Sequence, residues 1–279
     1  MTYRSLLVLL DPAPLCVARS QVAIRLAREL DCHLVGLAPT GLVALPPAPE
    51  AVGTMVEYGA LAQRALRDQA ERAVRRFRDA CAAAGVASFE ALTDESDKAV
   101  SLVRHAHCSD LLVLTQADPN APGYALNRTL VEEVVLQSAR PTLIVPYAGR
   151  FETLGSTVMV AWDDSREAAR AVADALPLLR RAGRVHVLGW NEQGAADALL
   201  RLRLEAVQTW LKHHGIAAHV HLEGTEIDIA DAMLSRAADL GVDLIVMGAY
   251  GHVRWIQRML GGATSGLLAS MTVPVLMSR

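Results

Sequence analysis

The last stretch of the chain, residues 243–279, decides the fold and reads DLIVMGAYGHVRWIQRMLGGATSGLLASMTVPVLMSR. Residues 244–247 form a short apolar run with β-branched members, which predicts a buried strand. Two pairs of glycines follow the run: Gly248 with Gly251, and Gly261 with Gly262. An apolar, helix-like segment then begins at Ala263, and a second apolar run, residues 273–277, closes the chain.

This order of strand, glycine turn, loop, glycine pair and helix start is the layout of a phosphate cradle. Glycines let backbone N–H groups approach a ligand closely, and a helix N-terminus favours an anion. Alternatively, the glycines only serve the turns of an ordinary α/β domain. The chain has no Gly-x4-Gly-Lys-Ser/Thr segment, so a Walker-type lysine is absent. Arg254 and Arg258 either reach phosphates or belong to a solvated loop with Trp255 folded inward.

Composition narrows the class of protein. The 27 basic and 30 acidic residues give a net charge of −3, which argues against a dedicated nucleic-acid binder. The four cysteines are widely spaced without a CxxC pair, as expected for buried free thiols in a reducing compartment. The apolar run at residues 6–10 is too short for a signal peptide, and no segment approaches the ~18 apolar residues of a membrane span. We therefore expect a cytoplasmic protein that meets neither nucleic acid nor a membrane.

The chain repeats one pattern of alternating strands and helices. In the first half we predict strands at residues 6–10, 33–37, 87–92, 110–115 and 142–145, and helices at 19–30, 60–84, 97–107 and 129–138. In the second half we predict strands at residues 158–161, 185–190, 218–222, 244–247 and 273–277, with helices at 165–181, 195–214, 227–240 and from 263. A proline-rich connection at residues 39–56 has no equivalent in the second half.

Two spacings support the repeat. Asp110 and Pro141 are 31 positions apart, as are Asp243 and Pro274. The sequence predicts an α/β protein of two tandem five-stranded, parallel-sheet domains of Rossmann-like type, at residues 1–150 and 151–279. Ligand sites of such sheets lie at the carboxyl ends of the strands.

Gly248-x2-Gly251-x9-Gly261-Gly262 resembles the nucleotide-binding signature of the universal stress protein family, usually Gly-x2-Gly-x9-Gly-Ser/Thr. With Asp163 ending the first strand of the second half, the whole chain is similar to tandem members of that family. The resemblance implies an adenine-nucleotide-hydrolase-like fold and a bound ATP, with any magnesium held through the phosphates. It also implies an intramolecular pseudo-dimer, with a homodimer open, in which residues 142–145 and 273–277 are candidates to pair.

The resemblance also implies the residues of the site. Ala161, Trp162 and Asp163 would lie near the adenosine, and Val187 and Leu188 would offer backbone contacts to adenine. Gly248 and Gly251 would flank the ribose and phosphates. The remaining members hold phosphates at the helix start: Gly261, Gly262, Ala263 and Thr264. Gly262 occupies the usual Ser/Thr position, so one hydroxyl is lost while the amide stays.

The first half departs further from the signature. Residues 115–120 read TQADPN, without the glycine pair and with a donor-free proline, and Asn127-Arg128-Thr129 stands where Gly-Gly-Ala would be. Asp11 remains at the end of the first strand. We predict no nucleotide in this half, which is a structural partner or binds something else.

Several side chains have two interpretations. Asp163 is a ligand contact, a cap of the following helix, or both, and Asp164 could also be the cap. His219 and His221 share one side of a strand, but sequence completes no metal set, so we predict no metal site. His107 beside Cys108 is interpreted as a bystander of a core thiol. The arginines of residues 60–84 alternate with acids, as on a solvated helix face.

The prediction for function is regulatory: ATP, or a related adenine nucleotide, in the second half would change a conformation or a partner surface during a stress response. Two alternatives stay open. One is a slow ATP hydrolase, for which no base or metal set is evident beside the cradle. The other is a nucleotide-free interaction scaffold, in which Gly262 and Trp162 have spoiled the site.

Overall fold

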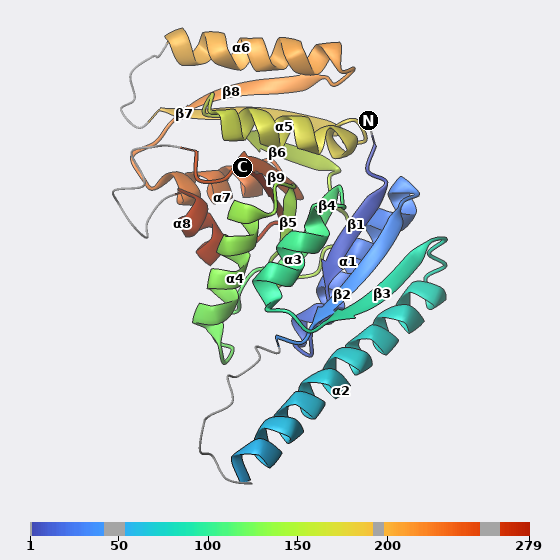
Figure 1. Ribbon diagram of the computed structural model, residues 1–279. Helices are drawn as coiled ribbons and strands as arrows, with labels where there is room; N and C mark the ends of the chain where they lie inside the picture. Colours follow the sequence, from blue (N-terminus) through green and yellow to red (C-terminus); the bar gives the residue numbers. More distant parts are fainter. Residues whose placement is uncertain (1, 42–53, 192–197, 252–262) are drawn as a thin grey trace. The chain divides into compact units, whose positions relative to one another are not determined.

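The computed structural model describes residues 2–41, 54–191, 198–251 and 263–279, and strands and helices alternate along the chain (Figure 1). The chain divides into two compact units. The N-terminal unit is Tyr3–Leu114, and the C-terminal unit contains Thr115–Arg279. The predicted α/β fold class with parallel strands is confirmed within both units.

The N-terminal unit contains a parallel sheet with strand order β3-β2-β1-β4. Its strands are β1 (Ser5–Leu9), β2 (His33–Pro39), β3 (Phe89–Asp94) and β4 (Leu111–Thr115). Leu6, Leu7 and Val8 are fully buried. Such unbroken apolar runs are typical of parallel strands because helices cover both faces of the sheet.

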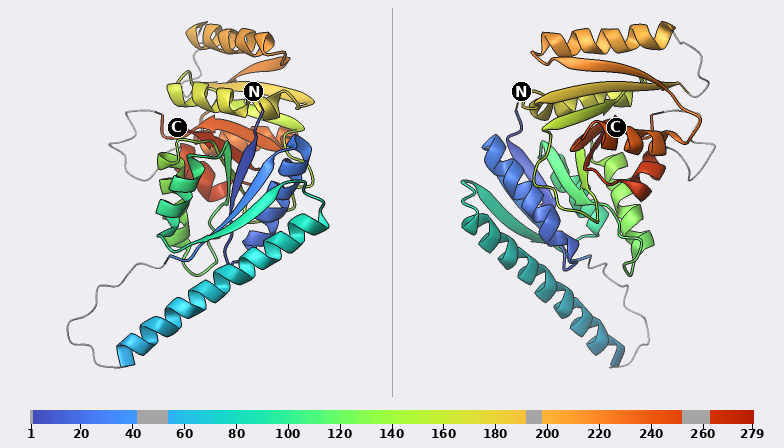
Figure 2. Two further views of the ribbon diagram at one scale, coloured as in Figure 1. Left: turned by 45° about the vertical axis from the view of Figure 1, so that its right-hand side comes forward. Right: turned by 180° about the vertical axis from the view of Figure 1, so that it is seen from behind.

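Three helices belong to this unit: α1 (Leu15–Leu30), α2 (Thr54–Ala83) and α3 (Lys98–Ala106). The long helix α2 lies alongside β3 (Figure 2). It begins earlier than predicted and is followed by Gly85, whose φ of +67° suits the turn out of a helix. The interpretation of its arginine-rich side as solvated is confirmed, since Arg67, Arg72 and Arg75 are exposed.

The C-terminal unit contains the strand order β5-β10-β9-β6-β7-β8. Its strands are β5 (Thr142–Val145), β6 (Thr157–Ala161), β7 (Arg184–Asn191), β8 (Ala218–Gly224), β9 (Leu244–Gly248) and β10 (Val275–Ser278). The pairs from β10 to β8 are parallel, whereas β5 and β10 pair antiparallel, with Ile144 opposite Val275. The predicted pairing of these two last strands is therefore confirmed. β10 begins after Pro274, whose ring nitrogen has no hydrogen to donate.

Five helices complete this unit: α4 (Tyr124–Gln137), α5 (Arg166–Leu179), α6 (Ala198–His213), α7 (Ile229–Asp239) and α8 (Ala263–Ser270). A Cβ added at Gly189 would meet α6 side chains, and one at Gly248 would meet the start of α5. The strand register places both positions on one face of the sheet. Helices α5 and α6 therefore share that face, and α7 and α8 lie on the other (Figure 2).

The compact units do not divide at residue 150, because β5 is hydrogen-bonded to β10 and so belongs to the C-terminal unit. A division into repeats at residue 150 stays a prediction. Within the described ranges, no helix combines the length and the apolar character needed to cross a membrane.

Candidate functional site

Three neighbouring strands of the C-terminal unit end at the same edge of the sheet. The register sets Ala161 of β6 opposite Leu188 of β7 and Met247 of β9. The N–H of Trp162 donates to the carbonyl of Leu188 at 2.8 Å, which extends the β6–β7 ladder by one residue. Most of the predicted adenosine contacts therefore lie together: Ala161, Trp162, Asp163, Val187, Leu188 and Gly248.

Asp163 organises the turn that leads from β6 into α5. Its Oδ1 accepts from the N–H of Ser165 at 3.0 Å and from the Ser165 hydroxyl at 2.6 Å. Ser165 is the N-cap of α5, and its Oγ accepts from the N–H of Ala168 at 3.1 Å. The helix cap is thus Ser165, and neither Asp163 nor Asp164 takes that role. Asp163 orients the cap, and its contact with a nucleotide stays a prediction.

Gly248 and Gly251 have packing roles of their own. A Cβ on Gly248 would lie 2.5 Å from the backbone nitrogen of Ala168, so only glycine allows β9 to end against α5. A Cβ on Gly251 would lie 2.9 Å from Oε2 of Glu167 and 3.0 Å from Oγ of Ser165. The backbone contact at Gly248 is therefore a packing requirement whether or not a ligand binds, whereas the neighbours of Gly251 are side-chain ends that can move.

Glu167 is a residue that the sequence analysis missed. It lies in the first turn of α5 with only 3% of its surface exposed, directly beside the glycine turn after β9. Burial opposes ionisation, but the Arg166 guanidinium, the N–H of Glu167 and the charge of Arg279 together lower the pKa of its carboxyl. The buried charge is compensated, as buried charges must be. An acidic residue in a first helical turn was the only sequence signal for it.

The other end of the glycine signature is the start of α8. Thr264 is 8% exposed, and its Oγ1 accepts from the N–H of Tyr250 at 3.4 Å, which joins the turn after β9 to the helix. Ala263, Thr264 and Ser265 form its first turn, whose N–H groups have no partner inside the helix. Five residues of the prediction lie outside the described ranges: Arg254, Trp255, Arg258, Gly261 and Gly262.

Helix α4 contributes charged groups beside α8. Arg128 donates through Nη2 to the hydroxyl of Ser265 and through Nε to Oε1 of Glu132, the latter at 2.9 Å. Burial and the nearby Glu132 carboxylate raise the pKa of the Tyr250 hydroxyl to about 12. Arg128 was predicted only as a departure from the glycine signature. Its arrival at α8 depends on tertiary structure, which the one-dimensional pattern does not contain.

The corresponding edge of the N-terminal unit is built differently. Arg19 is 2% exposed; its Nε donates to the carbonyl of Leu9 at 2.7 Å, and its Nη2 lies 3.0 Å from Oδ2 of Asp11. The aspartate at the end of β1 is therefore paired with a buried guanidinium. The absence of a nucleotide from this half stays a prediction.

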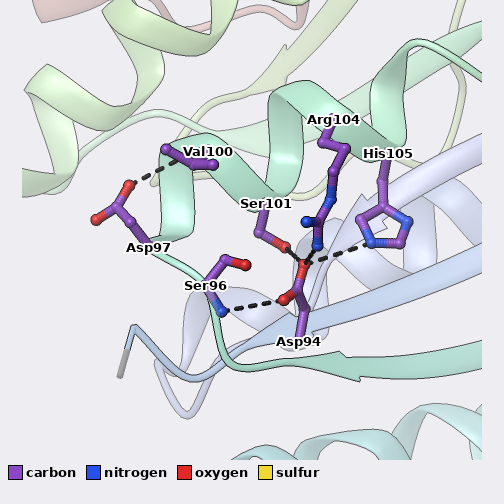
Figure 3. Close-up of polar contacts among 7 residues, drawn as sticks. All are labelled: Asp94, Ser96, Asp97, Val100, Ser101, Arg104 and His105. Atoms are coloured by element: carbon purple, nitrogen blue, oxygen red, sulfur yellow. Dashed lines mark hydrogen bonds and ion pairs between the residues drawn. The ribbon is translucent and has the colours of Figure 1, made fainter. Parts of the chain in front are cut away.

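A second carboxylate, Asp94, ends β3 in the same unit (Figure 3). It accepts from the Ser101 hydroxyl at 2.7 Å and from the N–H of Ser96 at 3.0 Å, and it pairs with Arg104 and His105. Burial raises the pKa of Asp94, but these hydrogen bonds outweigh it and hold the pKa well below its ordinary value. The cluster fixes the start of α3 to the end of β3.

Three histidines gather on β7 and β8. Nδ1 of His186 lies 3.0 Å from Nε2 of His221, and the rings of His186 and His219 are 5.6 Å apart. Sequence placed His219 and His221 on one side of the strand but missed His186. Burial and the neighbouring histidines lower the pKa of His186. Within the part of the chain that the structure describes, no group of three His, Cys, Asp or Glu side chains could hold a metal ion.

The interpretation of Cys108 as a core thiol is wrong. Cys16, Cys32 and Cys81 are buried and free, as predicted, whereas Cys108 is exposed. It lies in the short turn between α3 and β4, where its N–H donates to the carbonyl of His105 at 3.3 Å. A turn that reverses the chain at the surface leaves its side chains in solvent.

Comparison with known proteins matches part of the chain to a family. The model of the universal stress protein family matches residues 156–279. The chain is similar to a crystal structure of a universal stress protein from Archaeoglobus fulgidus, with a TM-score of 0.76 and 19% identity, over 99% of this chain and 96% of that one. It is also similar to a Pseudomonas aeruginosa protein assigned to the universal stress proteins, with a TM-score of 0.61 and 16% identity, over 99% and 93%. At these identities the two structures show the fold alone. No curated protein sequence matches the chain.

Proposed function

We propose that the second half of the chain, whose residues 156–279 match the universal stress protein family, binds ATP or a related adenine nucleotide as a regulatory ligand. The nucleotide would occupy the edge of the sheet where β6, β7 and β9 end. Its occupancy would alter a conformation or a partner surface in a cytoplasmic stress response.

One observation carries the proposal: the turn after β9, where the glycine signature begins, is hydrogen-bonded to the first turn of α8, which follows the signature in sequence. Gly248 ends β9, and Tyr250 lies two residues after it in the turn. The N–H of Tyr250 donates to the hydroxyl of Thr264 in the first turn of α8. Parallel α/β sheets bind their ligands outside the carboxyl ends of the strands, and a helix N-terminus there favours phosphate. The amides of Ala263 and Thr264 would take the phosphates together with Gly261 and Gly262.

The adenosine would lie against the ends of β6 and β7. The backbone of Val187 and Leu188 offers polar contacts for the base, and Asp163 lies one residue past the last ladder bond of β6. The buried Nε1 of Trp162 has no hydrogen-bond partner among the described residues. A buried donor without a partner is unfavourable by about 1–3 kcal/mol, so an acceptor on a ligand would be stabilising here.

Magnesium would enter with the nucleotide and be held through its phosphates. Among the described residues, no cluster of acidic, histidine or cysteine side chains could hold a metal ion by itself. The residues of this edge would bind and orient the nucleotide, and no side chain is assigned to a chemical step.

The test is calorimetric titration of the full chain with ATP, accompanied by native mass spectrometry of the purified protein for a retained nucleotide. Gly261→Val should abolish ATP binding, because a β-branched side chain would block the amides of the cradle. A thermal unfolding curve should show that this variant remains folded. Wild-type protein without affinity at millimolar ATP would instead support the nucleotide-free scaffold.

A turnover assay with Asp163→Ala would distinguish an ATP hydrolase from a protein that only binds ATP. Loss of both binding and phosphate release in this variant would assign turnover to this edge. Phosphate release that is unchanged in Asp163→Ala would count against catalysis at the proposed site.

A further inference from the structure

We propose that Arg128, on helix α4, is a phosphate-binding residue of the nucleotide site at the start of α8. The inference rests on the proposed function, and it adds a cation from the first repeat to a site in the second. Both helices belong to the C-terminal unit.

The contact with Ser265 places the Arg128 guanidinium at the first turn of α8. Nη2 of Arg128 donates to Oγ of Ser265, the third residue of that helix. Side chains of a helix lean toward its N-terminus, so the Ser265 hydroxyl lies on the side of the free N–H groups. The guanidinium therefore lies near the helix end to which a phosphate would bind.

The charge environment keeps the guanidinium available to an anion. Nε of Arg128 donates to Glu132, and the Arg128 side chain remains 31% exposed. The guanidinium is also hydrogen-bonded to Tyr124, and since it has five N–H donors in a planar fork, these three bonds still leave donors for a phosphate oxygen. A second acid beside α8 is Asp228, whose Oδ1 would lie 3.7 Å from a Cβ on Gly266. That oxygen already accepts from the N–H of Ala230.

The repeat pattern accounts for the position of Arg128 in the chain. Arg128 and Gly261 lie 133 positions apart, the same offset as Asp110 and Asp243. Helix α4 begins at Tyr124, earlier than the predicted residue 129, so Arg128 lies on an ordered helical turn. The repeat that lacks the glycines thus presents a cation at the position where the other repeat has a glycine.

The experiment titrates wild type and Arg128→Gln with ATP and with adenosine. Arg128→Gln should weaken ATP binding by about tenfold, as expected for one charge-assisted hydrogen bond to phosphate. Adenosine has no phosphate, so its affinity should not change. Arg128→Lys keeps the charge but lacks the planar fork of donors. Its ATP affinity should lie between those of wild type and Arg128→Gln.

A matched control removes an equivalent arginine elsewhere. Arg170 pairs with Asp174 on α5 at 2.8 Å, also between positions i and i+4. Arg170→Gln should bind ATP as wild type does. Glu132→Gln, which removes the acid that competes for Arg128, should bind ATP at least as tightly as wild type.

Three results would overturn the inference. Wild-type ATP affinity in Arg128→Gln excludes a phosphate contact while leaving the proposed function intact. Equal losses for ATP and adenosine in Arg128→Gln show a structural role only. If Arg128→Gln cannot be purified folded, equal losses for ATP and adenosine in Arg128→Lys lead to the same conclusion. A wild-type protein that binds neither ligand rejects the proposed function together with this inference.

Discussion

The two predicted repeats use the same aspartate-to-backbone contacts at the start of their sheets but different side chains at the edges where ligands would bind. Asp110 accepts from the N–H groups of Arg4 and Ser5, and Asp243 accepts from those of Ser156 and Thr157. At the ligand edge the aspartates differ. Asp11 is paired with the buried Arg19, whereas the equivalent of Arg19 in the second repeat is the buried Ala171. Contacts that hold strands together are thus shared, and those that face a ligand are not.

The largest expected loss in the free energy of unfolding comes from Arg19→Met. Removing the guanidinium leaves Asp11, whose side chain is 19% exposed, without its cationic partner. Breaking a buried ion pair from one side typically lowers the free energy of unfolding by about 3–5 kcal/mol, and solvent access to Asp11 favours the lower end. Urea unfolding would measure the loss. Arg28→Met, on the exposed side of the same helix, should change the midpoint little.

An equal loss of stability in Arg19→Met and Arg28→Met would mean that the ion pair of Arg19 with Asp11 does not stabilise the fold. The first predicted repeat would then be as stable without the pair of Asp11 and Arg19, and the contrast with Asp163 would lose its physical basis.

The second-largest expected loss in the free energy of unfolding comes from Gly248→Ala in the second predicted repeat. The added Cβ would lie 2.5 Å from the backbone nitrogen of Ala168, so β9 and α5 would have to separate. Overpacking of this kind typically lowers the free energy of unfolding by about 1–3 kcal/mol. Thr115, the residue of the first repeat at the same offset, already carries a side chain and is 8% exposed. Thr115→Ala is the comparison, and a midpoint for Gly248→Ala at or above that of wild type would show that the strand end can relax.

The N-terminal unit should also respond to acid through Asp94. Its pKa is lowered in the folded state, so its contribution is complete above the ordinary carboxyl pKa of about 4. As the pH falls below that value toward the folded-state pKa, protonation removes the contribution at up to about 1.4 kcal/mol per pH unit. Unfolding curves between pH 5 and about pH 3 would measure the slope. Asp94→Asn should flatten it, and an unchanged slope in that variant would assign the acid response to other carboxylates.

Much of this fold follows from local patterns. The apolar runs predict the central strands β1, β4, β6 and β9 because those strands are buried on both faces, whereas β3 and β8 are only partly buried. The predicted helix starts at residues 97 and 165 coincide with the caps Asp97 and Ser165. The errors have tertiary causes. Helix α4 begins early, Cys108 is in a surface turn, and His186 joins a histidine cluster only through strand pairing.

The candidate site was predictable in part for the same reason. Asp163 and Gly248 are recognisable because a strand end and a glycine signature mark them. Glu167 and Arg128 are not, because each becomes part of this region through a helix that packs against it. Spacing in one dimension cannot report such a contact.

The smallest expected effect is a difference in stability between Asn substitutions at Asp110 and at Asp243. Asp110 uses one oxygen, Oδ2, for both N–H groups, at 2.7 and 3.0 Å. Asp243 uses Oδ2 for Ser156, at 3.1 Å, and Oδ1 for Thr157, at 3.0 Å. An asparagine has only one acceptor oxygen, so Asp110→Asn can keep both bonds, whereas Asp243→Asn must turn an NH2 group toward an N–H.

We therefore expect Asp243→Asn to lower the free energy of unfolding by about 1 kcal/mol more than Asp110→Asn does. Urea unfolding of the two variants under identical conditions would measure this difference. Equal losses would mean that the carboxylate charge, and not the number of acceptor oxygens, stabilises the start of each repeat. In that case the shared contact would be electrostatic in both repeats, and Asp→Ala should affect each of them more than Asp→Asn.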